Sequence, residues 1–322
     1  MDYKKTQQAE LSSVFPTQEI NLEQQAELQL HIKLNNLRNH TLKLIANSRP
    51  LKEILYNIAK GVEIENPDML CSILLLDSST QQLNVGAAPS LPRFYNEAVE
   101  GTPVAYGIGA CGTAASLGKR TITENITTHA FWQDYQELTQ KAGVASCWSE
   151  PIFSSAGSVV GTFAIYKRQP STPTATDFHL IEQSAHLASI AIELASANDK
   201  IWRQTNYDRL TGLANRQQIY NQLQIMLTEK KSADKQLALL HIDLDDFKSI
   251  NSGFGYDCGD RLLMETANRI SLLLAKGDSV ARISADEFVV VINDANLRRV
   301  DELSERILLQ LSKPFQTNST QS

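Results

Sequence analysis

The chain opens with a polar stretch and then takes on a helical spacing of apolar residues. Residues 1–22 are polar and without period, which predicts a disordered tail. From residue 23 the apolar positions form a short heptad seam that predicts a helix over 23–48, with Leu30, Leu34, Leu37 and Leu44 along one side. Such a seam is typical of a helix that pairs with a partner, and equally of an amphipathic helix lying on its own domain. The pattern leaves both interpretations open.

Residues 49–195 change to a mixture of strand and helix signals, which predicts a mixed α/β or α+β domain. Strand-like runs such as 71–76 and 158–166 are separated by clusters of Gly, Pro, Ser and Asn. A helix is expected to start near residue 175, with Thr174, followed by Asp177 three residues on, or else Thr176 as its N-cap. Its small apolar face continues to about residue 206, so residues 196–206 are expected to act as a connecting helix.

Residues 207–322 follow a different pattern. The spacing predicts helices over about 215–228, 259–276 and 296–311, a strand over 236–243 and a strand pair within 281–293. After the first helix the order is βαββα, which indicates a ferredoxin-like or palm-like sheet covered by helices on one side. A sheet of this kind is normally completed by a further strand, whereas the chain closes with a polar stretch, 316–322. We therefore expect a fragment of a longer protein, or a domain that lacks its C-terminal part.

Composition narrows the class of protein. At 322 residues with 42% hydrophobic and 20% charged residues, the chain is long enough for two globular domains. No apolar run reaches the roughly 18 to 20 residues of a membrane span, and the polar start does not resemble a signal peptide, so a cytoplasmic protein without a membrane partner is expected. A net charge of −6 excludes a broad cationic field for a nucleic-acid polymer, but not a nucleotide held through metal ions.

Two groups of acidic residues are candidates for chemistry. Asp243 and Asp245 fall at alternate positions at the end of the strand 236–243 and are expected to face the same way, near a glycine-bearing loop at 251–255. Asp286 and Glu287 sit at the expected turn of the strand pair. If the two elements are neighbours, Asp243 and Asp286 would share a Mg²⁺ ion. Solvated acidic loops and a polar turn with a capping acid explain the same residues.

Several separated motifs in this half resemble the GGDEF family of diguanylate cyclases. The resemblance spans residues 207 to about 315 and is carried by 207–216 (YDRLTGLANR), 243–248 (DLDDFK), Asn251, 259–260 (GD) and 282–288 (RISADEF). It implies a reaction in which two GTP molecules, one on each subunit of a homodimer, condense to cyclic di-GMP with release of pyrophosphate.

The same resemblance implies roles for individual residues. Mg²⁺ would be held by Asp243, Asp286 and the Leu244 carbonyl, and Glu287 would activate the 3′-hydroxyl or hold a second ion. The remaining implied contacts are with the nucleotide, through Phe247 and Lys248 to the phosphates and through Asn251 and Asp260 to guanine. Phosphoryl transfer of this kind needs positioned cations more than a covalent nucleophile.

The chain departs from the family pattern at the signature itself. Ser284 and Ala285 stand where the family has two glycines, and a Cβ there would cost roughly 1 to 3 kcal/mol of backbone strain or intrude on the ligand. The family's inhibitory product site pairs an Arg with an Asp three residues on. Here Asp278 is present but Ala275 takes the Arg position, so this site is expected to be lost.

The first half resembles a GAF domain, which implies an antiparallel sheet with flanking helices and a small-molecule pocket on one face. The matching segments are 70–77, 87–92, 109–115 (GACGTAA), 147–152 (CWSEPI) and 161–164. The ligand is not named by the resemblance. Candidate pocket residues are Cys111, Cys147, Trp132, Trp148 and His129, for which core packing is the alternative. The four cysteines form no CxxC pair, so reduced thiols are expected.

Taken together, these features predict a bacterial cyclic di-GMP signalling protein with a GAF sensor, a connecting helix that supports a homodimer, and a degenerate GGDEF output with little or no cyclase activity. One alternative is an active diguanylate cyclase. Another is a module that binds GTP without turnover and regulates a phosphodiesterase domain absent from this chain.

Overall fold

The computed structural model describes residues 22–229 and 236–315, apart from the side chains of residues 22–31, 33, 34 and 229. The predicted tail therefore lies almost entirely outside the described residues. The chain divides into two compact units, residues 1–196 and 197–322, and each is considered by itself. No helix in the described ranges combines the length and apolar character needed to cross a membrane.

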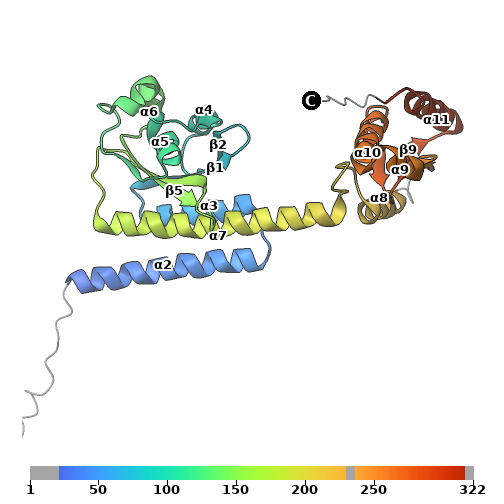
Figure 1. The fold of residues 1–322 in the computed structure, drawn as a ribbon. Coiled ribbons are helices and arrows are strands. Elements are labelled where there is room, and N and C mark those ends of the chain that lie inside the picture. The colour runs from blue at the N-terminus through green and yellow to red at the C-terminus, as the bar shows by residue number, and fades with distance from the viewer. Residues whose placement is uncertain (1–21, 230–235, 316–322) are drawn as a thin grey trace, which may run out of the picture. The chain divides into compact units, whose positions relative to one another are not determined.

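Unit 1 is built on a six-stranded antiparallel sheet with the strand order β3-β2-β1-β6-β5-β4. The strands are β1 (Met69–Asp77), β2 (Gln82–Ala87), β3 (Thr102–Pro103), β4 (Thr121–Thr123), β5 (Ser146–Phe153) and β6 (Val159–Lys167). Helices cover both faces of this sheet (Figure 1). The expected antiparallel sheet with flanking helices is confirmed.

The two faces of the sheet carry separate cores because successive strand residues point to opposite sides. Cys71 and Ile73 of β1 pack with α3 (Leu51–Glu65) and the first part of α7 (Ala175–Asn206). Leu70 and Leu74 point the other way and belong to the second core. The elements over that face are α4 (Arg93–Val99), α5 (Gly109–Leu117), the 3₁₀ helix η1 (Ala130–Tyr135) and α6 (Gln136–Ala142).

Helix α2 (Leu22–Ala46) carries the predicted heptad seam. Leu37 and Leu44 pack against the first core of unit 1. The contact is close, since a Cβ added to Gly61 of α3 would lie 2.5 Å from Leu37 Cδ1. For these two leucines the structure shows packing on the helix's own domain, while the side chains of Leu30 and Leu34 lie outside the described residues.

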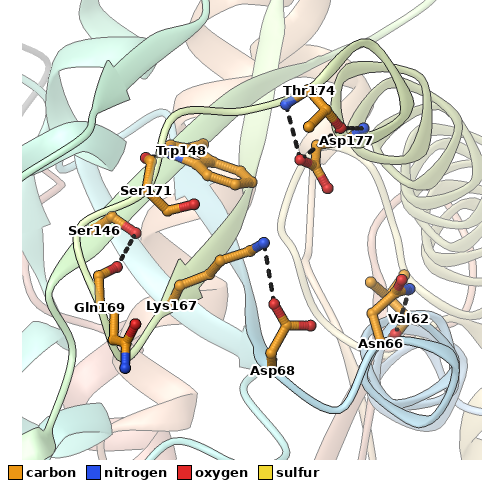
Figure 2. A network of polar contacts seen from close by, with 10 residues as sticks. All are labelled: Val62, Asn66, Asp68, Ser146, Trp148, Lys167, Gln169, Ser171, Thr174 and Asp177. Atoms are coloured by element: carbon orange, nitrogen blue, oxygen red, sulfur yellow. Dashed lines mark hydrogen bonds and ion pairs between the residues drawn. The ribbon is translucent and has the colours of Figure 1, made fainter.

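Helix α7 begins where the sequence predicts. Thr174 donates from its amide and its hydroxyl to Asp177 Oδ2, both at 2.8 Å, and the Asp177 amide donates to Thr174 Oγ1 at 3.2 Å (Figure 2). This reciprocal capping satisfies amides that the first turn leaves without partners. Thr174 is thus confirmed as the N-cap. The helix runs to Asn206 and so crosses the boundary between the units.

Unit 2 contains a three-stranded antiparallel sheet with the order β7-β9-β8. Its elements are α8 (Arg216–Glu229), β7 (Gln236–Asp243), α9 (Phe247–Phe254), α10 (Tyr256–Ser271), β8 (Ser279–Arg282), β9 (Glu287–Ala295) and α11 (Leu297–Leu311). Helices α10 and α11 pack on one face. The expectation of helices on one side only is wrong, because Ile219 of α8 packs with Val289 and Val291 on the opposite face.

The region after β7 also differs from the prediction. The expected loop at 251–255 is mostly helix, since α9 continues to Phe254 and ends at Gly255, which has a φ of 85°. Phe247 and Ile250, three residues apart, supply a helical apolar side that the glycines obscured. Strand β7 ends at Asp243, so the alternation argument does not reach Asp245. Asp246 turns the chain into α9 with a φ of 59°.

Candidate functional site

The acidic residues of unit 2 meet at one end of its sheet. Asp243 of β7 lies directly opposite Glu287 of β9, and paired residues of antiparallel strands point to the same face. One residue further on, the Leu244 amide donates to the Asp286 carbonyl at 3.3 Å. The strand pair therefore neighbours β7, as the shared-ion hypothesis requires. The backbones of Asp243 and Leu244 lie beside those of Glu287 and Asp286, and the residue directly opposite Asp243 is Glu287, not Asp286.

These residues would supply only part of the ligand set of a Mg²⁺ ion. Within the described ranges, no group of three or more His, Cys, Asp or Glu side chains is arranged to hold a metal ion. Mg²⁺ is commonly held by one or two carboxylates, with waters and substrate phosphates completing its octahedron. Two carboxylates from adjacent strands and the Leu244 carbonyl therefore fit an ion that arrives with a nucleotide, but not a closed protein cage.

The expected phosphate contacts differ in accessibility. Lys248 is exposed at the start of α9. Phe247 is 7% exposed and packs into the core of unit 2, so its side chain is not offered to a phosphate. The amides of Phe247 and Ser249 already donate to the carbonyls of Leu244 and Asp246, at 3.4 and 2.9 Å, so the positive charge of Lys248 is the main feature of this turn that would attract a phosphate.

The expected guanine contacts lie on α9 and α10. Asn251 Oδ1 is buried and has no hydrogen-bond partner among the described residues, while Asp260 is exposed. Gly259 makes room for this asparagine, because a Cβ at that position would lie 1.9 Å from Asn251 Oδ1. In the sequence, Gly259 belongs to a matching motif but carries no predicted role. Its role is to let the two helices cross at Asn251.

Ser284 and Ala285 form the exposed turn between β8 and β9, closed by the Ile283 amide, which donates to the Glu287 carbonyl at 2.9 Å. Among the described residues, the non-glycine positions with positive φ are Ser48, Gln81, Asp246 and Asp294. Neither Ser284 nor Ala285 is in the left-handed region. The predicted backbone strain is therefore not present, which leaves intrusion on a ligand as the one route by which these Cβ atoms would act.

An arginine that the sequence analysis passed over holds this turn. Arg282 donates to the Ala285 carbonyl from Nε at 3.2 Å and from Nη2 at 2.6 Å, and from Nη1 to Asp208 Oδ1 at 3.1 Å. The Arg282 amide also donates to the Ala214 carbonyl at 3.0 Å. Asp208 and Ala214, both in the segment 207–216, thus help to hold Arg282 and, through it, the turn.

The electrostatics of Asp208 reflect these bonds. Burial raises its pKa, but hydrogen bonds from Thr211 and from the Arg282 guanidinium outweigh burial, so the pKa lies below its ordinary value. The carboxylate of Asp208 is therefore held in its charged form.

Asp278, expected to be the remnant of an inhibitory site, is bonded to its own chain. Its side chain is 1% exposed and accepts from Arg299 Nη2 at 2.8 and 2.6 Å. It also accepts from the amides of Ala275 at 3.1 Å and Asn293 at 3.0 Å. Both carboxylate oxygens are thus occupied in holding the segment before β8, and no free acid is offered to a ligand.

The candidate pocket residues of unit 1 do not all lie together: Cys111, Cys147 and Trp132 belong to the second core, whereas Trp148 belongs to the first. Cys111 and Trp132 border a cavity of about 40 Å³ between α5, η1 and the sheet. Trp148 does not, because it follows Cys147 on β5 and so points to the opposite face. There its Nε1 donates to the Ser171 carbonyl at 3.1 Å, beside Lys167 (Figure 2). His129 caps η1, where its Nδ1 accepts from the Phe131 amide at 3.3 Å.

Known protein families match both halves of the chain. The GAF domain model matches residues 48–193, and the model described as diguanylate cyclase, GGDEF domain, matches residues 205–322. Two solved structures illustrate the likeness. A GGDEF family protein from Caulobacter crescentus is 34% identical, covering 35% of this chain and 74% of that one, with a TM-score of 0.34. A GAF domain from an Acinetobacter phosphotransferase is 19% identical, covering 52% and 97%, with a TM-score of 0.41.

Curated relatives share parts of the chain. The methyl sulfide methyltransferase-associated sensor of Methanosarcina acetivorans is 40% identical over 52% of this chain and 17% of its own length. Diguanylate cyclase DgcP of Escherichia coli is 30% identical over 61% and 60%. The bifunctional diguanylate cyclase/cyclic di-GMP phosphodiesterase MucR of Pseudomonas aeruginosa is 33% identical over 41% and 19%. The chain thus spans less than two thirds of each of these relatives. The two family models thus match the chain in the order GAF domain, then GGDEF domain.

Proposed function

We propose that this chain is a cyclic di-GMP signalling protein whose GGDEF domain binds GTP with Mg²⁺ and has little or no cyclase activity of its own. The observation that carries the proposal is the placement of Asp243 opposite Glu287, beside a turn in which Ser284 and Ala285 replace glycines. The acids that would hold the ion are retained, whereas the turn that would face the phosphates carries two additional Cβ atoms. The names of DgcP and MucR support the same signalling system.

In this proposal the residues of unit 2 bind and orient the nucleotide. Bound Mg²⁺ would neutralise phosphate charge and lower the barrier to phosphoryl transfer. Lys248, at the start of α9, would hold the phosphates. The unpartnered oxygen of Asn251 supports a guanine contact, because a buried acceptor without a bond costs about 1 to 3 kcal/mol that a ligand donor or a rotated amide would recover. Condensation needs a second GTP, so a homodimer is part of the proposal.

The loss of activity would follow from geometry. A displacement of reacting groups by about 1 Å can cost roughly a hundredfold in rate. Side chains at Ser284 and Ala285 would displace the phosphates by that order if the ligand approaches the turn as closely as glycines permit. An active cyclase is the second candidate, and it is favoured by the unstrained backbone of the turn.

The cyclase assay separates these two candidates. The purified chain is incubated with GTP and Mg²⁺, and cyclic di-GMP is quantified for the wild type, for the Ser284→Gly/Ala285→Gly variant and for Asp286→Ala. We expect product to rise by about a hundredfold in the double-glycine variant and to be absent from Asp286→Ala. A wild type that turns over as fast as the double-glycine variant would exclude the impaired cyclase and leave the active one.

GTP binding is tested separately from turnover. A fluorescent GTP analogue is titrated against the wild type, Lys248→Ala and Asn251→Ala, with Lys119→Ala in unit 1 as a matched control for loss of an exposed lysine. We expect weaker binding for the first two variants and no change for the control. Equal affinity in all four proteins would remove nucleotide binding from the proposal. Tight binding without turnover would favour a regulatory module for a phosphodiesterase domain on another part of a longer protein.

A further inference from the structure

Two of the four cysteines lie together in the second core of unit 1. Cys147 of β5 is paired with Tyr166 of β6. Cys111 of α5 lies over them, with its Sγ 3.9 Å from Tyr166 Oη. Cys147 is fully buried, Cys111 is 7% exposed, and both belong to one cluster of buried side chains. The two thiols are close enough for each to shift the pKa of the other.

Helix α5 approaches the sheet closely enough to allow this contact because its inward residues are small. Ala110 and Ala114 are fully buried. Gly112 has no room for a side chain, since a Cβ there would lie 2.7 Å from the Pro103 carbonyl oxygen. The sequence 109–115 (GACGTAA) therefore brings the backbone of Cys111 down to β5.

Cys111 and Cys147 are surrounded by more buried hydroxyl groups than core packing alone requires. Ser149 and Thr162 are fully buried, and within the part of the chain that the structure describes their hydroxyl oxygens have no well-formed hydrogen bond. Both hydroxyls approach Cys111. An unsatisfied buried hydroxyl costs about 1 to 3 kcal/mol, so two of them beside one sulfur call for an explanation. They would both gain a strong acceptor if that sulfur became an anion.

The two thiols are chemically unequal. The hydrogen bond from Cys147 lowers the pKa of Cys111 most, burial opposes it, and Ser149, Thr162 and Tyr166 add to the lowering, so the pKa falls to about 7. Cys111 is also the third residue of α5, where the helix dipole stabilises a thiolate. Burial raises the pKa of Cys147 well above its ordinary value. One thiol is thus prepared to attack, and its neighbour keeps its proton.

A small oxidant has a place beside Cys111. The cavity of about 40 Å³ that this residue borders is lined mainly by apolar and aromatic side chains, including Tyr95, Trp132 and Tyr166. One water needs at least about 10 to 15 Å³ of such space, so the cavity has room for a molecule of two to three heavy atoms. Hydrogen peroxide meets this limit, whereas glutathione disulfide does not.

We propose that Cys111 and Cys147 form an oxidisable dithiol in the GAF domain, which hydrogen peroxide converts to an intramolecular disulfide. The Cys111 thiolate attacks one peroxide oxygen, the O–O bond breaks, and the leaving hydroxide takes a proton to become water. Cys111 is then a sulfenic acid. The Cys147 sulfur attacks the Cys111 sulfur, the S–S bond forms, and the hydroxyl leaves with the Cys147 proton as a second water. Two thiols lose two electrons, and one peroxide becomes two waters.

The other two cysteines serve as internal controls. Cys71 is fully buried on the opposite face of the sheet, in the first core. Burial raises the pKa of Cys71 well above its ordinary value, so it should remain a thiol. Cys258 is partly exposed in unit 2 and would form disulfides between molecules instead.

The test uses the full chain carrying Cys258→Ser, treated with hydrogen peroxide in modest excess. Free thiols are counted under denaturing conditions, and disulfides are located by peptide mass spectrometry. This variant has three thiols before treatment, since four cysteines less Cys258 leave three. We expect one afterwards, at Cys71, together with a cross-linked peptide containing Cys111 and Cys147 that is lighter by two hydrogens and is restored by dithiothreitol.

Two variants separate the chemistry from a structural effect, with far-UV circular dichroism as the check of folding. Cys147→Ala should leave Cys111 to proceed to sulfinic acid, because no resolving thiol remains. Ser149→Ala with Thr162→Val should raise the pKa of Cys111 and slow oxidation at pH 7, by about fivefold if the pKa rises by about one unit.

Three results would overturn the proposal. They are three thiols that stay reduced in the folded chain, a Cys111 that is oxidised to sulfinic acid with Cys147 present and no cross-link, and a disulfide that involves Cys71. Each is read directly from the Cys258→Ser protein, so the outcome does not depend on whether the further variants fold.

Discussion

Replacing Arg282 by lysine tests how the turn at Ser284 and Ala285, between β8 and β9, is held in place. The guanidinium donates twice to the Ala285 carbonyl and once to Asp208, and a single ammonium on a different stem cannot keep all three bonds. A hydrogen bond to a charged group is worth about 1.5 to 3 kcal/mol. The Arg282 and Asp208 side chains are 13% and 25% exposed, so we discount this for solvent and expect a local loss of about 1.4 kcal/mol.

The loss is measured by hydrogen exchange at the turn. The Ile283 amide donates to the Glu287 carbonyl across the turn and should exchange about tenfold faster in Arg282→Lys, because 1.4 kcal/mol is a factor of ten. Arg298→Lys is the matched control, since Arg298 is 88% exposed and its pair with Glu302 is worth under about 1 kcal/mol. Unchanged exchange at Ile283 in both variants would refute the reasoning.

The remaining predictions concern pH, packing and a buried charge. Because the pKa of Asp208 is lowered in the folded chain, its stabilisation should be complete above pH 3.8 and vanish as the pH falls through the lowered value. The urea midpoints of wild type and Asp208→Asn should therefore differ at pH 7 and converge in acid, and a constant difference would contradict this. Gly161→Ala places a Cβ 2.3 Å from the Leu74 carbonyl oxygen, so it should lower the free energy of unfolding by about 1 to 3 kcal/mol and with it the melting temperature. Gly253→Ala is the control, because the space around Gly253 is open, and it should leave the melting temperature unchanged. Arg299→Met leaves Asp278 buried and unpaired and should cost unit 2 about 3 to 5 kcal/mol in urea unfolding; a cost below about 1 kcal/mol would show that the pair is not needed.

Periodic elements were predictable from the sequence because their signals are local. The strand 236–243 and the helix from Ala175 to Asn206 match their predicted bounds, and the Thr174 cap follows from a side chain three residues away. Helix α9 is hard to predict because Gly253 and Gly255 indicate a loop, while its apolar side consists of few residues. Trp148 was assigned to the pocket although strand parity alone separates it from Cys147.

Contacts between distant residues were not predictable from spacing. Arg282 reaches Asp208 across 74 positions, and Gly259 matters only because α9 and α10 cross at Asn251. Cys111 and Cys147 were both candidates, but their pairing depends on helix α5, which the sequence analysis did not predict. The absence of strain at Ser284 likewise depends on dihedral angles that residue identity did not fix.

Strand β5 contributes side chains to both cores of unit 1, so a movement in one core can be passed to the other. Consecutive residues, Cys147 and Trp148, are fixed in opposite cores, each closely packed. Dense interiors resist compression and pass displacement on to their neighbours. A chemical change at the Cys147 sulfur would therefore displace the Trp148 side chain. Because the indole donates to the Ser171 carbonyl, that displacement would reach the segment that precedes α7. In this arrangement the sheet does not isolate the two cores. It couples them, because a displacement in one core is passed through β5 to the other.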